Sequence, residues 1–138
     1  MKNLDGQQLT MIVPVYNGMQ FIDSFFKPIN TFNPDWEIIF VDNGSTDGTR
    51  EWLEENQEKF NLGLIFPEKN LRVGGAWTLL TNYYTPDDFD YILLLDNDGW
   101  MLPSKTNWYE DCISLFNSDK NIGSLGLQCE RKPGYFSM

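Results

Sequence analysis

The chain has 138 residues, a length that suits one domain with its own core and is too short for two. Twenty acidic side chains outnumber ten basic ones, so the formal net charge is −10 at pH 7. This charge argues against a nucleic-acid backbone or an anionic membrane surface as the main partner. An anionic ligand such as a nucleotide would need local positive potential, and a divalent cation is the obvious source.

Histidine and cysteine, which often act in catalysis or metal binding, are absent or rare in this chain. Histidine is absent, so any acid–base or metal chemistry falls to carboxylates. Cys112 and Cys129 lack CxxC spacing, and we expect them to be buried, reduced thiols. The N-terminus has no apolar signal region, and the longest apolar runs are about five residues, far short of a membrane span. We therefore expect a cytoplasmic protein without a membrane span.

Apolar runs alternate with amphipathic segments along the chain. The predicted order is strand 9–15, helix 18–30, strand 36–41, helix 49–60, strand 62–66, helix 75–84, strand 91–95, helix 104–117 and strand 122–128. Such alternation is typical of a parallel sheet with right-handed crossovers. Residues 38–41 and 92–95 are apolar throughout, as expected of strands covered on both faces. We predict one α/β domain over residues 1–138, three-layered and Rossmann-like, with a mainly parallel central sheet truncated after about five strands.

The first four predicted strands each end in a polar, glycine-bearing turn. In open α/β sheets, ligands bind beyond the carboxyl ends of the strands. These ends lie at one edge of a parallel sheet, so we expect the four turns to converge on a single site. Their sequences are PVYNG at 14–18, DNGSTDG at 42–48, EKNLRVGG at 68–75 and DNDG at 96–99.

The turn after the second strand contains Asn43-Gly44, which by itself favours a β-hairpin. The following sequence TDGTREWLEEN instead indicates a helix, with cap-type residues at 45–47. Asp42 would then lie in a strand-to-helix turn, where its carboxylate can accept hydrogen bonds from N–H or hydroxyl groups of a ligand. A solvated turn residue is the alternative interpretation.

Asp96 and Asp98 follow the fourth strand with one residue between them. Two carboxylates at this spacing suit a shared Mg²⁺ or Mn²⁺ ion whose shell is completed by water and ligand phosphate. A calcium-binding EF-hand is excluded because the spacing would place Leu94 and Lys105 at ligand positions. A plain structural turn remains open. Trp100 is a candidate wall against a sugar or base, with a core position as the alternative.

The segment before the third helix is the cationic, glycine-bearing loop of the chain. Lys69 and Arg72 precede Gly74-Gly75. Main-chain N–H groups at a helix start attract anions, and nearby cations strengthen that attraction. A plain turn is the alternative interpretation of the glycine pair.

Four segments together resemble a known family. MIVPVYNG, VDNGSTDGT, NLRVGGAW and YILLLDNDGWMLP lie within residues 9–128. In this order and spacing they are similar to the N-terminal, nucleotide-sugar-binding part of a family 2 glycosyltransferase with the GT-A fold. The resemblance implies a nucleotide-diphosphosugar donor of the UDP, GDP or dTDP type and transfer of its sugar, with inversion, to a carbohydrate or other hydroxyl acceptor. It also implies Mn²⁺ or Mg²⁺ as cofactor.

The resemblance also assigns roles to residues of this chain. Those implied to line the base and ribose are Pro14, Val15, Tyr16 and Asn17. Asp42 is implied to bind the base, with Asn43 beside it. The residues implied to lie near the nucleotide are Asn70, Arg72, Gly75 and Asn97. Asp96 is implied to lie near the ribose and metal, and Asp98 to hold the metal and so activate the leaving group.

The chain departs from the family pattern in three places. Family members often carry glycine where Arg72 stands and a second acid where Asn43 stands. They also continue past the fifth strand into an acceptor half that supplies the catalytic base, which we expect to be missing here. Glu130 is the only acid of the final segment, and nothing marks it as a positioned base, so the base stays unassigned.

Two functions therefore remain open. The chain is either an inverting glycosyltransferase, with a partner subunit or second copy as one source of the base, or a non-catalytic nucleotide-sugar-binding module. A signalling receiver domain of similar length is disfavoured, because no acid follows the first strand until Asp23.

Overall fold

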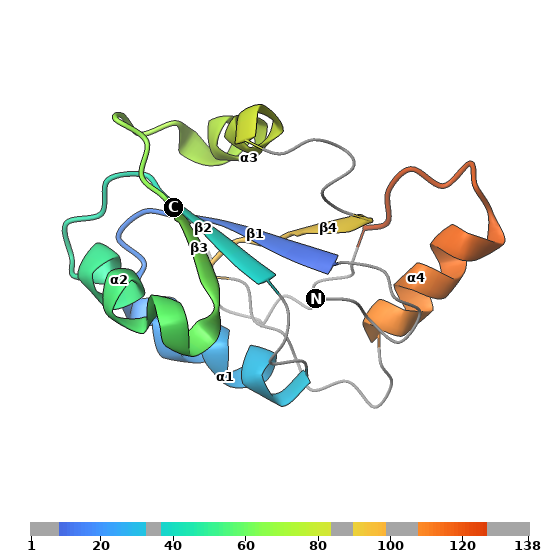
Figure 1. Cartoon of the computed structure of the whole chain (residues 1–138), viewed down its shortest axis with the longest axis horizontal. Helices are drawn as coiled ribbons and strands as arrows, with labels where there is room; N and C mark the ends of the chain where they lie inside the picture. The colour runs from blue at the N-terminus through green and yellow to red at the C-terminus, as the bar shows by residue number, and fades with distance from the viewer. Residues whose placement is uncertain (1–8, 33–36, 84–89, 99–107, 127–138) are drawn as a thin grey trace, which may run out of the picture. The chain divides into compact units, whose positions relative to one another are not determined.

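The computed structural model describes residues 9–32, 37–83, 90–98 and 108–126 (Figure 1). The chain divides into two compact units, Met1–Leu102 and Pro103–Met138. The first unit contains a four-stranded, all-parallel sheet in the order β3-β2-β1-β4. Its elements are β1 (Leu9–Val15), the short 3-10 helix η1 (Met19–Phe21), α1 (Ile22–Phe32), β2 (Glu37–Asp42), α2 (Thr49–Phe60), β3 (Leu62–Ile65), α3 (Arg72–Tyr83) and β4 (Tyr91–Leu94). The α/β fold with a parallel sheet is thereby confirmed.

The helices of this unit cover the two faces of the sheet. Helices α1 and α2 lie on one face, and α3 lies on the other (Figure 1). The strand order explains this, because the chain steps from β1 to β2 to β3 in one direction and then returns past β1 to β4. Right-handed crossovers in opposite directions place their helices on opposite faces. The reversal leaves a topological switch point between the carboxyl ends of β1 and β4, the position where open α/β sheets bind ligands.

Aromatic packing attaches α1 and α2 to the sheet. Phe40 of β2 contacts Phe25 and Phe26 of α1, with ring centroids 5.5 and 5.8 Å apart. Phe26 also stacks on Phe60 of α2 at 4.6 Å. Aromatic pairs at these separations add to the free energy gained by burial. Helices α1 and α2 thus hold the carboxyl ends of β1 and β2 in place through these aromatic contacts.

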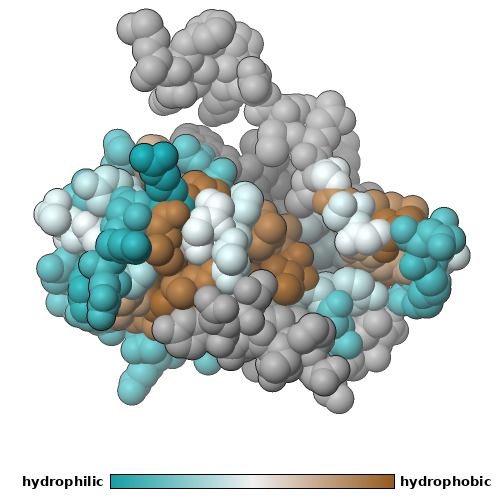
Figure 2. All heavy atoms as spheres, turned by 90° about the horizontal axis from the view of Figure 1, so that it is seen from above, coloured by the Kyte–Doolittle hydropathy of each residue, from teal (hydrophilic) through white to brown (hydrophobic). Residues whose placement is uncertain are grey.

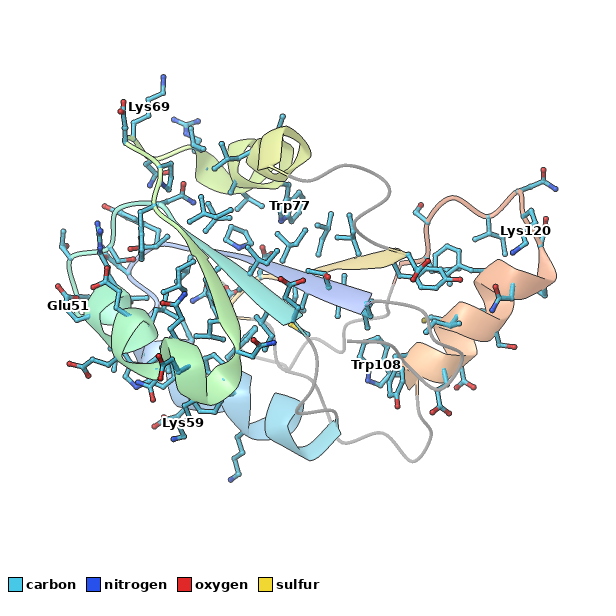
Figure 3. All side chains as sticks on the ribbon, in the orientation of Figure 1. Glu51, Lys59, Lys69, Trp77, Trp108 and Lys120 are labelled. Carbon is cyan, nitrogen blue, oxygen red and sulfur yellow. The ribbon has the colours of Figure 1, made fainter. Side chains whose placement is uncertain are left out.

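The opposite face is covered less completely. Trp77 points from α3 toward the sheet and packs on Ile12 and Ile39 (Figure 3). Further along this face, Ile92 and Leu94 of β4 are 51% and 48% exposed. The expectation that β4 is covered on both faces is therefore wrong, because α3 packs over β1 rather than over β4. Seen from the α3 side, apolar side chains reach the surface beside hydrophilic ones (Figure 2).

Two element boundaries differ from the predictions. Helix α3 begins at Arg72 rather than 75, and the Asn70 side chain accepts a hydrogen bond from the Arg72 N–H at 2.8 Å at this start. Residues 122–126 form no strand, so the predicted strand 122–128 is wrong over this part, and residues 127–128 lie outside the described residues. Gly123 and Gly126 supply no side chains to pack, which weakens a strand.

The second unit contains α4 (Trp108–Ser118), in which Ile113 is buried. Cys112 of this helix carries a free thiol and is half-buried, so it is less buried than expected. Burial and the neighbouring Asp111 charge raise the pKa of the Cys112 thiol. Cys129 lies outside the described residues. Among the helices that the structure describes, none is long and apolar enough to cross a membrane.

Candidate functional site

The loops after β1 and β2 are joined through Asn17. The Asn17 N–H donates to Ser45 Oγ at 2.9 Å, and Asn17 Oδ1 accepts from the Thr46 N–H at 2.8 Å. Asn17 adopts a left-handed backbone conformation, with φ of 51°, which turns its main chain toward the neighbouring loop. Asparagine tolerates this region better than most residues, because its short side chain can form hydrogen bonds locally. The predicted site residue is therefore also a structural link between two strand ends.

Two further hydrogen bonds continue this connection. The Gly18 N–H donates to Thr49 Oγ1 at 3.0 Å, and the Met19 N–H donates to Asp47 Oδ2 at 2.9 Å. Asp47 Oδ1 accepts from both the N–H and the hydroxyl of Thr49. Partial burial acts to raise the pKa of Asp47, but hydrogen bonds from Thr49 and the main chain outweigh it and hold this pKa below its usual value. We call the hydrogen bonds between residues 17–19 and 45–49 the strand-end clamp.

Asp42 is the last residue of β2 and has an unusual environment for a carboxylate. Its side chain is almost fully buried, with 1% of the residue exposed. Oδ1 accepts hydrogen bonds from the Ser45 N–H at 3.0 Å and the Ser45 hydroxyl at 2.5 Å. Oδ2 is also buried, and no residue within the described ranges donates to it. A buried acceptor without a donor costs free energy, so a hydrogen bond to Asp42 Oδ2 would be favourable.

Asn43 extends the connection to the loop after β3. Its N–H donates to the Val15 carbonyl at 2.9 Å, and its Oδ1 accepts from the Leu71 N–H at 2.9 Å. The buried side chain therefore holds the segment that contains Asn70 against the end of β2. The hairpin interpretation of Asn43-Gly44 is wrong, because residues 42–49 lead into α2 and β3 runs parallel to β2. Gly44 has a φ of 90°, so the turn itself uses the freedom of glycine.

The end of β4 lies beside the end of β1. The Leu95 N–H donates to the Ile12 carbonyl at 3.1 Å, which extends the pairing of the two strands. Gly18 lies so close to Asn97 that a Cβ atom at Gly18 would clash with the Asn97 amide. The structure thus places the DND segment against the turn that follows β1. This contact lies at the switch point of the sheet, where ligand binding is expected.

The DND segment contains two acidic residues separated by Asn97. Burial raises the pKa of Asp96, and the nearby Asp98 carboxylate raises it further. Two carboxylates this close would be stabilised by a divalent cation between or beside them, and such a cation takes its remaining ligands from water and phosphate. No group of three or more Cys, Asp or Glu side chains in the described part of the chain could hold a metal by itself. The described side chains thus form no complete metal site by themselves.

The remaining predicted residues lie around the same edge with different exposure. Tyr16 is 56% exposed directly after β1, whereas Pro14 and Val15 are buried inside the strand. The pairing of β1 with β4 ends at Ile12. Pro14 lies beyond it, so the N–H that proline lacks interrupts no hydrogen bond between these two strands. Asn70 and Arg72 are exposed at the start of α3, and Lys69 points away from the sheet (Figure 3). Gly75 packs its main chain on the Leu71 side chain.

Ser45 and Asp47 were predicted only as cap-type residues, and Thr49 only as the start of a helix. All three join the loops after β1 and β2, and Ser45 also donates to Asp42. The sequence STDGT contains more hydroxyl and carboxylate groups than one helix start requires, and this excess could have indicated a second role for them. Trp100 and Glu130 lie outside the described residues.

Comparison with known proteins decides the family. A profile described as "Glycosyl transferase family 2" matches residues 10–132, which is most of the chain. The chain belongs to glycosyltransferase family 2. Among curated family relatives, abequosyltransferase RfbV of Salmonella typhimurium is 30% identical over 127 residues, covering 90% of this chain and 36% of that protein. Processive diacylglycerol beta-glycosyltransferase of Mycoplasma pneumoniae is 31% identical over 96 residues, covering 65% of this chain and 27% of that protein.

Solved structures share the fold of this family 2 chain at low identity. S. aureus TarS 1-349 in complex with UDP-GlcNAc aligns with a TM-score of 0.63 and 22% identity, covering 80% of this chain and 31% of that one. Mannosyltransferase PcManGT from Pyrobaculum calidifontis, in complex with GDP-Man and Mn²⁺, aligns with a TM-score of 0.57 and 23% identity, covering 70% and 29%. The chain thus spans about a third of the length of these relatives.

Proposed function

We propose that this chain binds a nucleotide-diphosphosugar and forms the donor half of a metal-dependent, inverting glycosyltransferase. The donor is of the UDP, GDP or dTDP type, and the acceptor is a carbohydrate or another hydroxyl compound. The observation that carries the proposal is the convergence of the four strand-end loops. Hydrogen bonds join the loops after β1, β2 and β3, and Gly18 contacts Asn97 after β4. A ligand at this edge would meet the buried Asp42 and the Asp96–Asp98 pair together.

Asp42 supports a role in binding the base. Its Oδ2 atom is buried and receives no hydrogen bond from the described residues. A nucleotide base can supply a ring N–H as donor, which satisfies this oxygen and gains a charge-assisted hydrogen bond. Tyr16 is exposed beside this position and offers an aromatic face for stacking. The TarS structure with UDP-GlcNAc has the same fold and supports a nucleotide sugar as the ligand class.

Asp96 and Asp98 support a role in holding a divalent cation with the diphosphate. We assign Asp98 as the principal ligand and Asp96 as the second, with Mn²⁺ or Mg²⁺ as the ion. The Mn²⁺ in the PcManGT complex supports this assignment. When bound, the cation would neutralise phosphate charge and stabilise the departing nucleotide diphosphate. This contribution matters in a chain whose net charge is −10, because the protein alone would repel a diphosphate.

A thermal-shift panel on the full chain tests the donor site. UDP-, GDP-, dTDP- and CDP-sugars are compared with and without Mn²⁺ for the wild type, Asp42→Ala and Asp98→Ala. A nucleotide sugar present at a hundred times its Kd should raise the free energy of unfolding by about 2.7 kcal/mol. We expect Asp98→Ala to lose the Mn²⁺-dependent part of the shift and Asp42→Ala to lose most of the shift.

Glu55→Ala, which removes an exposed acid from α2, is the matched control and should respond like the wild type. If no nucleotide sugar produces a Mn²⁺-dependent shift in the wild type, the proposed site is wrong. Incubation of the best donor with simple hydroxyl acceptors, followed by NMR of the anomeric proton, then tests transfer and inversion. Binding without turnover would assign the chain the role of a nucleotide-sugar-binding module instead.

A further inference from the structure

The two oxygens of the Asp42 carboxylate have different partners. Oδ1 accepts two hydrogen bonds from Ser45, from the N–H at 3.0 Å and from the hydroxyl at 2.5 Å. Oδ2 accepts none from the described residues, although it is equally buried. The Asp42 carboxylate is therefore asymmetric, and Oδ2 is the oxygen left for a ligand.

The Ser45 hydroxyl has a fixed direction. A main-chain N–H can only donate and a carboxylate oxygen can only accept, so the hydroxyl must accept from the Asn17 N–H and give its own proton to Asp42. Both partners are anchored, because Asp42 ends a buried strand and Asn17 is also held by the Thr46 N–H. Rotation of the Asp42 carboxylate would break the short hydrogen bond to the hydroxyl. Ser45 thus fixes which carboxylate oxygen is already hydrogen-bonded and which one is left without a donor.

We infer that Ser45 is a positioning residue that sets base selectivity by holding Oδ1 and leaving Oδ2 as a single, oriented acceptor. This inference rests on the proposed function, in which Asp42 binds the base. Uracil, thymine and guanine carry a ring N–H beside a carbonyl group and can donate to such an acceptor. Cytosine has an unprotonated nitrogen at the corresponding ring position, so its lone pair would face the carboxylate. The inferred donor class therefore excludes CDP-sugars.

Matched variants distinguish an effect of Ser45 on base selectivity from a general loss of structure. Ser45→Ala removes the hydroxyl, Ser45→Cys keeps the shape with a weak donor, and Ser45→Thr keeps the hydroxyl. Thr46→Ala is the control, because Thr46 takes part in the strand-end clamp through its main-chain N–H. Titration calorimetry in Mn²⁺ measures the Kd of CDP, UDP, dTDP and GDP. The readout is the selectivity ratio, which is the Kd of CDP divided by the lowest Kd among the other three nucleotides. Thermal melts establish that each variant is folded.

The wild type should bind its preferred nucleotide at least about tenfold more tightly than CDP. Ser45→Ala should weaken the preferred nucleotide about tenfold and lower the selectivity ratio at least about threefold, because only the main-chain N–H of residue 45 then holds Oδ1 and the carboxylate is less firmly oriented. Ser45→Cys should lower the ratio by a smaller factor, whereas Ser45→Thr and Thr46→Ala should stay within about twofold of the wild type.

An unchanged ratio in Ser45→Ala would overturn the inference, even if both affinities fell equally, since that result indicates a purely structural role. If Ser45→Ala does not fold, an unchanged ratio in Ser45→Cys has the same meaning. A wild type that binds nucleotides without disfavouring CDP would also overturn it while leaving the donor site intact. A wild type that binds no nucleotide would instead refute the proposed function, and the inference with it.

Discussion

At the scale of single residues, Arg72 stands out because its backbone is left-handed, with φ of 57°. In this region the Cβ atom approaches the following carbonyl oxygen, at a cost of about 1–2 kcal/mol that glycine avoids. Arg72 begins α3, and its N–H donates to the Asn70 side chain at the edge of the proposed site. The glycine that family members often carry here is therefore explained by the backbone, and the arginine of this chain is held at some cost.

Replacing Arg72 by glycine should relieve this cost, whereas replacing it by alanine should not. Both variants lose the same charged side chain, and both keep the main-chain N–H that donates to Asn70. We expect Arg72→Gly to be more stable than Arg72→Ala by about 1 kcal/mol, after allowing for the greater flexibility of glycine in the unfolded chain. Urea unfolding of the two variants measures the difference. Equal stabilities would mean that residue 72 is not left-handed in solution.

Asp47 predicts a specific dependence of stability on pH. Its pKa in the folded chain lies below the ordinary value of 3.8, so its hydrogen bonds stabilise the folded state only while the carboxylate is ionised. This stabilisation is present above the unfolded pKa and is lost as the pH falls through the lower, folded value. The wild type should therefore exceed Asp47→Asn in stability at pH 7, and the gap should narrow below about pH 4.

Unfolding curves recorded between pH 7 and 3 measure this gap. Glu58→Gln removes an exposed carboxylate from α2 and serves as the control for loss of charge alone. A gap between the wild type and Asp47→Asn that is constant over this pH range would contradict the role of the ionised carboxylate in the strand-end clamp.

At the scale of elements, the attachment of α3 depends on Trp77. The ring packs on Ile12 and Ile39, while its Nε1–H is buried and finds no acceptor among the described residues. Trp77→Phe keeps much of the apolar contact and removes the unsatisfied donor, so it should cost less than about 1 kcal/mol. Trp77→Ala leaves a cavity and should cost about 3–4 kcal/mol. Urea unfolding measures both values, and a Phe variant as unstable as the Ala variant would show that Nε1 has an acceptor in solution.

The elements themselves were largely predictable from local sequence. Each of the first four strands and three helices lies within a few residues of its predicted range, because apolar period and cap residues are local properties. The two failures have different causes. The two glycines within residues 122–126 are a local signal against the predicted strand, whereas Ile92 and Leu94 read as buried although α3 does not reach them. Coverage by a neighbouring element cannot be read from a strand's own residues.

The convergence of the strand-end loops was predictable, but the hydrogen bonds that join them were not. Topology alone brings Asp42, Asn17 and Asn97 to one edge, because parallel strands share their carboxyl ends. The role of Ser45 depends on a hydroxyl that contacts two separate strand ends at once. That geometry follows from the left-handed turn at Asn17 and cannot be inferred from spacing along the chain.

At the scale of the whole molecule, the acidic excess is mostly uncompensated. The ion pair between Arg50 and Glu54 of α2 joins two side chains that are each about half exposed. Exposed pairs of this kind contribute little, usually under about 1 kcal/mol. A net charge of −10 on a chain of this size therefore acts mainly as self-repulsion, which favours expanded states over the compact one.

Screening this repulsion should stabilise the fold. Raising NaCl from about 10 to 300 mM shortens the Debye length from about 30 Å to less than 8 Å. We expect the melting temperature to rise by about 3–5 °C, equivalent to roughly 1 kcal/mol.

Glu58→Lys changes the net charge from −10 to −8 and should both raise the melting temperature at low salt and reduce its response to salt. KCl in place of NaCl should give the same curve, because screening does not depend on the identity of the monovalent cation. A melting temperature that falls with salt would show that attractive ion pairs outweigh the repulsion, and the acidic excess would then not support the proposed divalent cation.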